Sequence, residues 1–128
     1  MKKLGLTKQE IRERLKTVEK WVTTSWTAIG GAVSDDEFRY IVAIWINGDM
    51  QATRTIEFSK LAKGGTLPDD LTSLWSPIPV APADFRQIPK GSYSIEDPIT
   101  VLEGGTRLYA KVDGNSVNVT INYWDSGV

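Results

Sequence analysis

The sequence predicts a mainly β protein, an antiparallel β-sandwich or jelly-roll-like domain preceded by an amphipathic helix. About seven or eight short runs rich in β-branched and aromatic residues are separated by Gly, Pro, Asn and Asp turns. The last run, within residues 114–128, alternates apolar and polar side chains as a half-buried strand does. A helical pattern is confined to the N-terminus. We therefore expect a basic helical arm over residues 1–21 and a β-sandwich domain over residues 22–128.

Residues 6–21 begin with the signature of a helix N-terminus. Thr7 and Glu10 have the spacing of a capping box, and Leu6 and Ile11 stand where a hydrophobic staple would pack. Apolar residues then recur at helical spacing, at Ile11, Leu15, Val18 and Val22. An isolated helix of this length is marginal in water, so the stripe must dock on its own domain or on a neighbour.

Charge is divided unevenly between the arm and the body. Residues 1–20 hold seven Lys or Arg against three Asp or Glu, a balance of +4. The whole chain carries −1, so the remainder carries −5. Such an arm is either a solvated helix or a segment that binds a neighbouring copy or an acidic partner. On the second interpretation, its partner-binding residues are Ile11, Arg12, Leu15, Lys16 and Val18.

The body of the chain reads as a succession of strands. Residues 38–46 are apolar on both faces, which is typical of a central strand and places Trp45 in the core. Residues 53–61 and 106–112 alternate, and their expected inward side chains are Ile56, Phe58, Leu108, Ala110 and Val112. Shorter strand signals cover residues 22–31, 71–80 and 99–102. Proline restricts residues 71–80 to a sheet edge.

The closing strand has two different faces. Val117, Val119, Ile121 and Tyr123 lie on one, and Asn118, Thr120, Asn122 and Trp124 on the other. We expect the first face to complete the core. The second either packs under the helix or meets another subunit. Among the five tryptophans, Trp75 and Trp124 are expected to be the most exposed, so Trp75, Asn118, Asn122 and Trp124 are further candidate partner-binding residues.

Composition removes many chemical mechanisms. The chain has no Cys and no His, so it lacks thiolate nucleophiles, disulfides and the commonest general base and metal ligand. Paired acids occur at residues 35–37, 69–70 and 96–97, but none has the spacing of a calcium loop. We expect no catalytic, cofactor or metal residues. The pI of about 5.4 argues against nucleic-acid binding. No apolar run predicts a signal peptide or a membrane helix, so we expect synthesis in a cytoplasm.

The second half of the chain resembles a known family. Pro98, Ile99 and residues 101–105 (VLEGG) are followed by Leu108 and by residues 117–121 (VNVTI). This pattern resembles small β-sandwich accessory proteins of tailed-bacteriophage particles, and the likeness extends over residues 37–125. Gly105 stands where that family usually has Asp.

The resemblance implies a non-enzymatic virion structural protein, either a capsid decoration or a head–tail, tail or fibre accessory. It also implies a symmetric homo-oligomer, a trimer or hexamer, bound to other virion proteins and made in the host cytoplasm. The alternative is a β-sandwich module that binds carbohydrate or another host-surface group, with exposed tryptophans beside Asn118, Asn122 or Tyr109.

Overall fold

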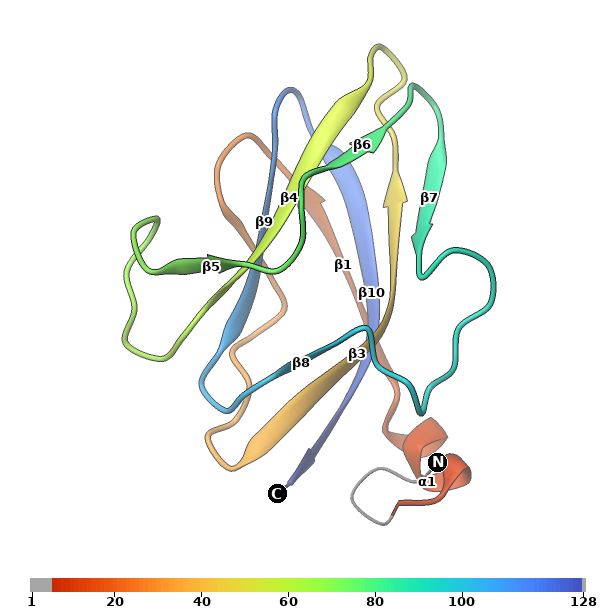
Figure 1. Ribbon diagram of the computed structural model, residues 1–128, viewed down its shortest axis with the longest axis vertical. Coiled ribbons are helices and arrows are strands. Elements are labelled where there is room, and N and C mark those ends of the chain that lie inside the picture. Colours follow the sequence, from red (N-terminus) through yellow and green to blue (C-terminus); the bar gives the residue numbers. More distant parts are fainter. Residues whose placement is uncertain (1–5, 128) are drawn as a thin grey trace.

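The computed structural model describes residues 6–127 and contains two antiparallel five-stranded sheets packed face to face (Figure 1). The first sheet has the order β1-β10-β3-β7, with β8 also paired to β3; the second has the order β2-β9-β4-β5, with β6 also paired to β4. The elements are α1 (Lys8–Arg14), β1 (Lys16–Val22), β2 (Thr27–Ile29), β3 (Glu37–Asn47), β4 (Arg54–Leu61), β5 (Leu71–Ser73), β6 (Ile78–Val80), β7 (Phe85–Ile88), β8 (Thr100–Leu102), β9 (Arg107–Val112) and β10 (Val117–Gly127). The predicted mainly β sandwich is confirmed.

The main core lies between the two sheets, and it is built from the predicted alternation. In β9 and β10 the apolar side chains buried between the two sheets are Leu108, Ala110, Val112, Val117, Val119 and Ile121. Ile56 and Phe58 of β4 complete the layer opposite. Each of these side chains is at most 1% exposed. The inward faces predicted for these strands are therefore correct.

The predicted helix is wrong beyond Arg14. Its capping box is present, with Thr7 and Glu10 hydrogen-bonded to each other's backbone, but the chain leaves the helix at Leu15. Lys16–Val22 instead forms β1, which pairs antiparallel with residues 117–123 of β10. Val18 and Val22 are four residues apart, a spacing that fits both a helix face and a strand face. The partner strand decides between the two, so the 21/22 boundary falls inside an element of the sandwich. Residues 1–5 of the expected arm lie outside the described residues.

The first predicted strand of the body, residues 22–31, is also shorter than expected. Val22 ends β1, residues 23–26 cross to the other sheet, and only Thr27–Ile29 forms β2. The proline-rich segment does supply edge strands, because β5 and β6 both pair with β4. Within residues 6–127 no helix is long and apolar enough to span a membrane.

The turn at Gly104 and Gly105 requires glycine at both positions. A Cβ on Gly104 would lie 2.4 Å from the backbone oxygen of Asp35, and Gly105 has a φ of +80°. Left-handed backbone of this kind is easily reached only by glycine. The turn lets β9 begin beside the loop that precedes β3, and this is why the Gly-Gly pair matters for the fold.

An ion pair between Arg39 and Asp125 links β3 to β10 near the C-terminal end of β10. Arg39 donates from Nε and Nη2 to the two carboxylate oxygens of Asp125 at 2.9 and 3.0 Å, and from Nη1 to the Gly31 carbonyl at 2.7 Å. Its guanidinium also lies 4.4 Å from the ring centre of Tyr123. Burial alone would lower the pKa of Arg39, but the hydrogen bond and charge of Asp125 outweigh it, so the pKa is raised. The pair stays charged and fixes β3 to β10.

Candidate functional site

The outward face of the first sheet carries the candidate site. In an antiparallel sheet, residues directly opposite each other project from the same face. One cross-strand row runs from β1 to β7 and contains Trp21, Asn118, Asn47 and Phe85. The next row contains Glu19, Thr120, Trp45 and Gln87. We call these eight residues the open face.

The aromatic side chains of the open face differ in how firmly they are held. Trp21 is 60% exposed and Phe85 is 56% exposed, one on each edge strand of the row. Trp45 between them is half-buried, with the edge of Tyr93 against its ring at a centroid distance of 5.7 Å. The prediction that Trp45 belongs to the core is therefore wrong. Its strand is apolar on both faces, but its outward side at this point is not covered by another layer.

Trp45 is fixed by a hydrogen-bonded partner in the neighbouring strand. Its Nε1 donates to Oε1 of Gln87 at 3.0 Å. The Gln87 Nε2 in turn donates to the carbonyls of Pro89 and Gly91. A side chain held on both sides loses little further freedom when a ligand binds. The centre of the open face is thus pre-organised, whereas its two exposed rings lie at the edges.

Amide groups fill the surface between the aromatic rings. Asn118 is only 6% exposed and lies in the row between Trp21 and Asn47. Asn122 lies two residues further along β10, and its Oδ1 is buried without a hydrogen-bond partner among residues 6–127. A buried acceptor without a partner is costly, and in proteins it is normally satisfied by water or by a ligand. The exposed Asn47 supplies hydrogen-bonding groups beside the rings, and Asn122 Oδ1 leaves one acceptor unused beneath the surface.

The other end of the same sheet face is covered. Trp124 is fully buried, stacks on Tyr40 at a centroid distance of 4.2 Å and donates from Nε1 to the Ile95 carbonyl at 3.0 Å. Ile11 of α1, also fully buried, packs in the same cluster. We call Ile11, Tyr40, Val42 and Trp124 the covered end. The prediction that Trp124 is among the most exposed tryptophans is wrong, because Ile11 of α1 and the segment around Ile95 pack against it.

A β-bulge brings the covered end into register. Asn122 pairs with Ala43, but the next residue, Tyr123, pairs with Ile41, so Val42 has no opposite residue in β10. Both Val42 and Ala43 are fully buried. The extra residue places Tyr40 directly opposite Trp124. The stacked pair under the helix depends on this shift.

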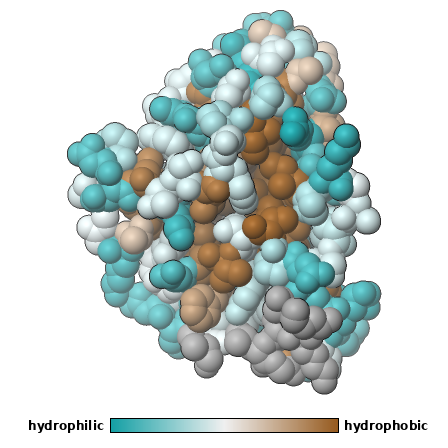
Figure 2. Space-filling model, viewed as in Figure 1, coloured by the Kyte–Doolittle hydropathy of each residue, from teal (hydrophilic) through white to brown (hydrophobic). Residues whose placement is uncertain are grey.

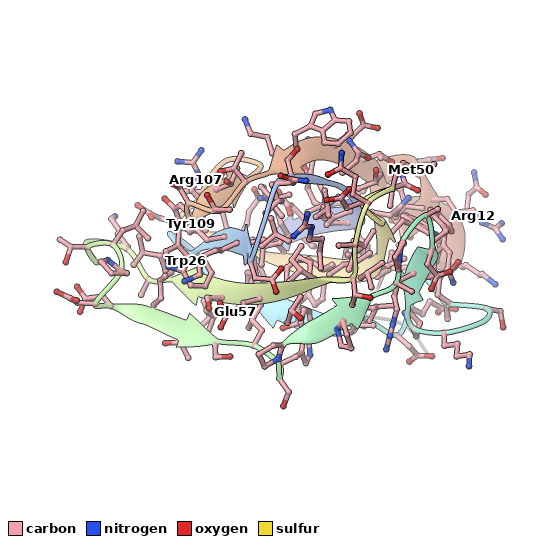
Figure 3. All side chains as sticks on the ribbon, turned by 90° about the horizontal axis from the view of Figure 1, so that it is seen from above. Arg12, Trp26, Met50, Glu57, Arg107 and Tyr109 are labelled. Carbon is pink, nitrogen blue, oxygen red and sulfur yellow. The ribbon has the colours of Figure 1, made fainter. Side chains whose placement is uncertain are left out.

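The other predicted partner-binding residues of the N-terminal arm lie in different parts of the structure. Leu15 packs against the covered end, whereas Val18 packs against the main core. Arg12 and Lys16 are exposed, and Arg12 projects away from the sandwich (Figure 3). The predicted partner-binding set thus does not form one surface. Whether any of these residues binds a partner stays a prediction.

Trp75 belongs to a different surface from the open face. Its ring meets Phe58 edge to face at a centroid distance of 5.7 Å, and it is partly buried against the main core. It is one member of an apolar band where the sandwich is open between the β5–β6 edge and the β7–β8 edge (Figure 2). We define the apolar band as Leu74, Trp75, Ile78, Ile88 and Ile99, which are all partly buried against the main core.

The outward side of the second sheet differs because its aromatic rings are paired with cations (Figure 3). Lys111 Nζ lies 4.9 Å from the ring centre of Trp26 and 3.7 Å from Glu57 Oε2. Arg107 lies 6.0 Å from the ring centre of Tyr109. Tyr109, proposed from sequence as a neighbour of a sugar site with Asn118 and Asn122, is therefore on the opposite sheet from both.

The acidic pairs do not converge. Within residues 6–127 no group of three acidic side chains is placed to hold a metal ion. Asp35 forms an ion pair with Lys63 at 2.6 Å, and Asp70 accepts hydrogen bonds from the backbone and hydroxyl of Thr66, which lower its pKa. These carboxylates serve local turns.

Sequence reasoning missed the two most exposed rings of the site. Trp21 was assigned to a helix, although the alternation of Glu19 and Trp21 with Val18 and Val22 also fits a strand with Trp21 outward. Phe85 lies in a proline-rich stretch with no periodicity to reveal a strand. The paired register that joins them across four strands has no local signal.

No family model matches the sequence, and no curated protein matches it. Two solved structures are similar in fold. PirA has a TM-score of 0.47 at 10% identity, over 84% of this chain and 92% of that chain. A chain from the Bacillus endospore appendages, described as disulfide-linked pili, has a TM-score of 0.39 at 14% identity, over 86% of this chain and 84% of that chain. Likeness at this level assigns no function to the present chain.

Proposed function

We propose that this protein is a non-enzymatic structural subunit of a larger assembly, an accessory component of a tailed-phage particle. The observation that carries the proposal is the apolar band. Contiguous apolar surface on a small domain commonly marks a site of protein association. Ile88 in this band lies on the edge strand β7 and is partly buried against the main core.

The apolar band is suited to a rigid contact because its side chains are continuous with the core. Trp75 packs on Phe58, and Ile78 lies opposite Ile56 across β4 and β6. Little side-chain ordering is then needed when a neighbour covers the band. In a symmetric assembly the same modest contact is repeated in every subunit, which strengthens the whole.

The sequence resemblance supports the more specific part of the proposal. Ile99 belongs both to the stretch that resembles phage accessory proteins and to the apolar band. We accordingly propose a symmetric homo-oligomer, a trimer or hexamer, made in the host cytoplasm and incorporated into the virion as a capsid decoration or a head–tail or tail accessory. The role requires no bond-making chemistry, in keeping with a chain that has neither Cys nor His.

The proposal is tested by the mass of the purified protein in solution, measured by light scattering after size-exclusion chromatography. The wild-type chain should have a multiple of the monomer mass, and Ile99→Asp, with its folding checked by circular dichroism, should shift it toward the monomer. Leu67→Asp is the matched control, because Leu67 is 44% exposed but lies outside the apolar band. A wild-type chain that stays monomeric and does not co-sediment with phage heads or tails contradicts the proposal.

A further inference from the structure

We propose that the open face binds a neutral oligosaccharide. This goes beyond the structural role and concerns a different surface, since the open face and the apolar band share no residue. The sequence suggested sugar binding at Trp75 or Trp124, but the structure places the first in the apolar band and the second in the covered end. The combination of exposed rings and an exposed amide occurs instead in the row of Trp21, Asn47 and Phe85.

The first reason is the arrangement of the aromatic rings. Trp21 and Phe85 are exposed at the two ends of one cross-strand row, and the fixed ring of Trp45 lies in the adjacent row. Aromatic side chains offer an apolar face, and Trp adds a polar N–H at its edge. The C–H faces of sugar rings fit such surfaces, while their hydroxyl groups need donors and acceptors alongside.

The second reason is the set of amides between the rings. Asn47 is exposed in the row between Trp21 and Phe85, and Asn118 beside it is 6% exposed. Asn122, two residues further along β10, has a buried Oδ1 without a partner within residues 6–127. An amide both donates and accepts, as a sugar hydroxyl does. Glu19 is the one charged residue of the eight in the open face, and it lies on the edge strand β1. This chemistry favours a polyhydroxylated, uncharged ligand over a charged one.

The third reason is size. Adjacent strands lie about 4.8 Å apart, so the row from Trp21 to Phe85 is roughly 14 Å wide, and successive rows on one face are roughly 7 Å apart. Tyr93 and the covered end border this surface on one side, and the turns after Asn47 and before Val117 border it on the other. The open area is on the order of 300 Å² by these spacings. A stable protein interface needs about 800 Å² on each partner, so a short oligosaccharide fits better than a folded protein.

A pocket extends the site past the edge of the sheet. It has a volume of about 420 Å³ and is lined by Asp84, Phe85, Arg86, Gln87 and Lys90. Phe85 and Gln87 belong to both the pocket and the open face. A ligand lying along the row would therefore have space for a terminal sugar ring beside β7. The charged side chains there, Asp84, Arg86 and Lys90, have opposite signs and can hydrogen-bond the hydroxyl groups of a neutral sugar.

The experiment uses the full chain and an array of neutral oligosaccharides of glucose, galactose, mannose and N-acetylglucosamine, followed by calorimetric titration of the best ligand. Trp21→Ala and Phe85→Ala should each weaken binding by about tenfold or more. Trp26→Ala is the matched control, because Trp26 lies on the other sheet beside Lys111, and it should leave affinity within about twofold. Both substituted rings are exposed, so thermal unfolding should confirm that each variant is folded.

Three results would overturn the inference. The first is the absence of binding to any oligosaccharide of the array at millimolar concentration. The second is binding that survives the Trp21→Ala, Phe85→Ala double variant unchanged. The third is a fall in solution mass caused by Trp21→Ala, which would show that the open face is occupied by a second copy of the chain. The first two results do not bear on the Ile99→Asp test, so the two proposals can fail separately. The third would move the contact between subunits from the apolar band to the open face.

Discussion

The covered end and the open face lie on the same side of the same two central strands, yet they use tryptophan in opposite ways. Trp124 is fully buried under α1, whereas Trp21 is 60% exposed on the edge strand β1. Both rings project outward from the first sheet. The difference arises from what lies above them, since α1 and the segment around Ile95 extend over one end only.

This comparison shows that a second apolar face on a strand does not by itself mean a second core. The outward face of β3 is covered at Tyr40 and Val42 but only half-covered at Trp45. Burial of the covered end stabilises the fold, whereas the exposed rings of the open face contribute little to it. Their retention on the surface is better explained by binding, which the substitutions below help to separate from stability.

The largest expected difference is between the two tryptophans. Trp124→Ala should lower the free energy of unfolding by about 3–5 kcal/mol, because it leaves a cavity and removes the stack on Tyr40. Trp21→Ala, the control, should change it by no more than about 0.5 kcal/mol. Urea denaturation followed by circular dichroism measures both. Equal losses for the two variants would mean that the open face is covered in solution.

A smaller loss of unfolding free energy is expected when α1 loses its buried side chain, Ile11. Ile11→Ala should cost about 2–3 kcal/mol, at the low end for a buried Ile, because the short helix can partly collapse toward Trp124. Trp124 should then gain contact with water, seen as a red shift of the fluorescence. Arg12→Ala, on the exposed side of α1, should change neither quantity. A neutral Ile11→Ala variant would show that α1 does not hold the covered end closed.

The start of the helix should contribute less again. Thr7 accepts a hydrogen bond from the Glu10 backbone N–H at 3.2 Å, and the Glu10 carboxylate accepts from the Thr7 backbone N–H at 3.0 Å. Thr7→Ala should cost about 1 kcal/mol. Thr7→Ser retains the hydroxyl and should recover most of the loss in the same unfolding assay. If Ser is no better than Ala, the hydroxyl is not the stabilising group.

The smallest expected effect on stability concerns Asp49, in the turn that follows Asn47 of the open face. It should appear only at acidic pH. Asp49 accepts hydrogen bonds from Gln51 N–H, from Arg54 Nε at 2.7 Å and from Asn115 Nδ2 at 2.9 Å, and these lower its pKa from 3.8 to about 2. Because the folded pKa is depressed, the ionised carboxylate stabilises the fold above about pH 4, and this contribution is lost as the pH falls toward 2. Urea midpoints of the wild type and Asp49→Asn should therefore converge between these values. Parallel pH profiles would contradict this.

The local alternation of apolar and polar residues was enough to predict the strands that have one buried face. β4, β9 and the first half of β10 alternate cleanly, and their inward residues, from Ile56 to Ile121, are those that the period of two predicts. The helix start was equally legible from Thr7 and Glu10. The end of the helix could not be predicted, because the spacing of Val18 and Val22 fits a helix face and a strand face equally. Only the pairing with β10 selects the strand.

The candidate site was predicted in part. Asn118 and Asn122 were correctly placed on the outward face of β10, but Trp75 and Trp124 were chosen as exposed rings in place of Trp21 and Phe85. Exposure of a large side chain depends on whether a distant segment covers it. For Trp124 that segment includes residue 11 and residue 95, and no local pattern reports such a contact.

The sequence by itself determined the all-β class, the inward faces of the alternating strands, the capping box and the absence of Cys and His chemistry, because these follow from composition and from neighbours along the chain. Only the tertiary structure decided that residues 16–22 form a strand, that β3 bulges at Val42 and that one end of the sheet is covered while the other is open. The physical reason is that strand pairing and burial are contacts between segments far apart in the sequence, and their free energies outweigh the weak local preference of either segment.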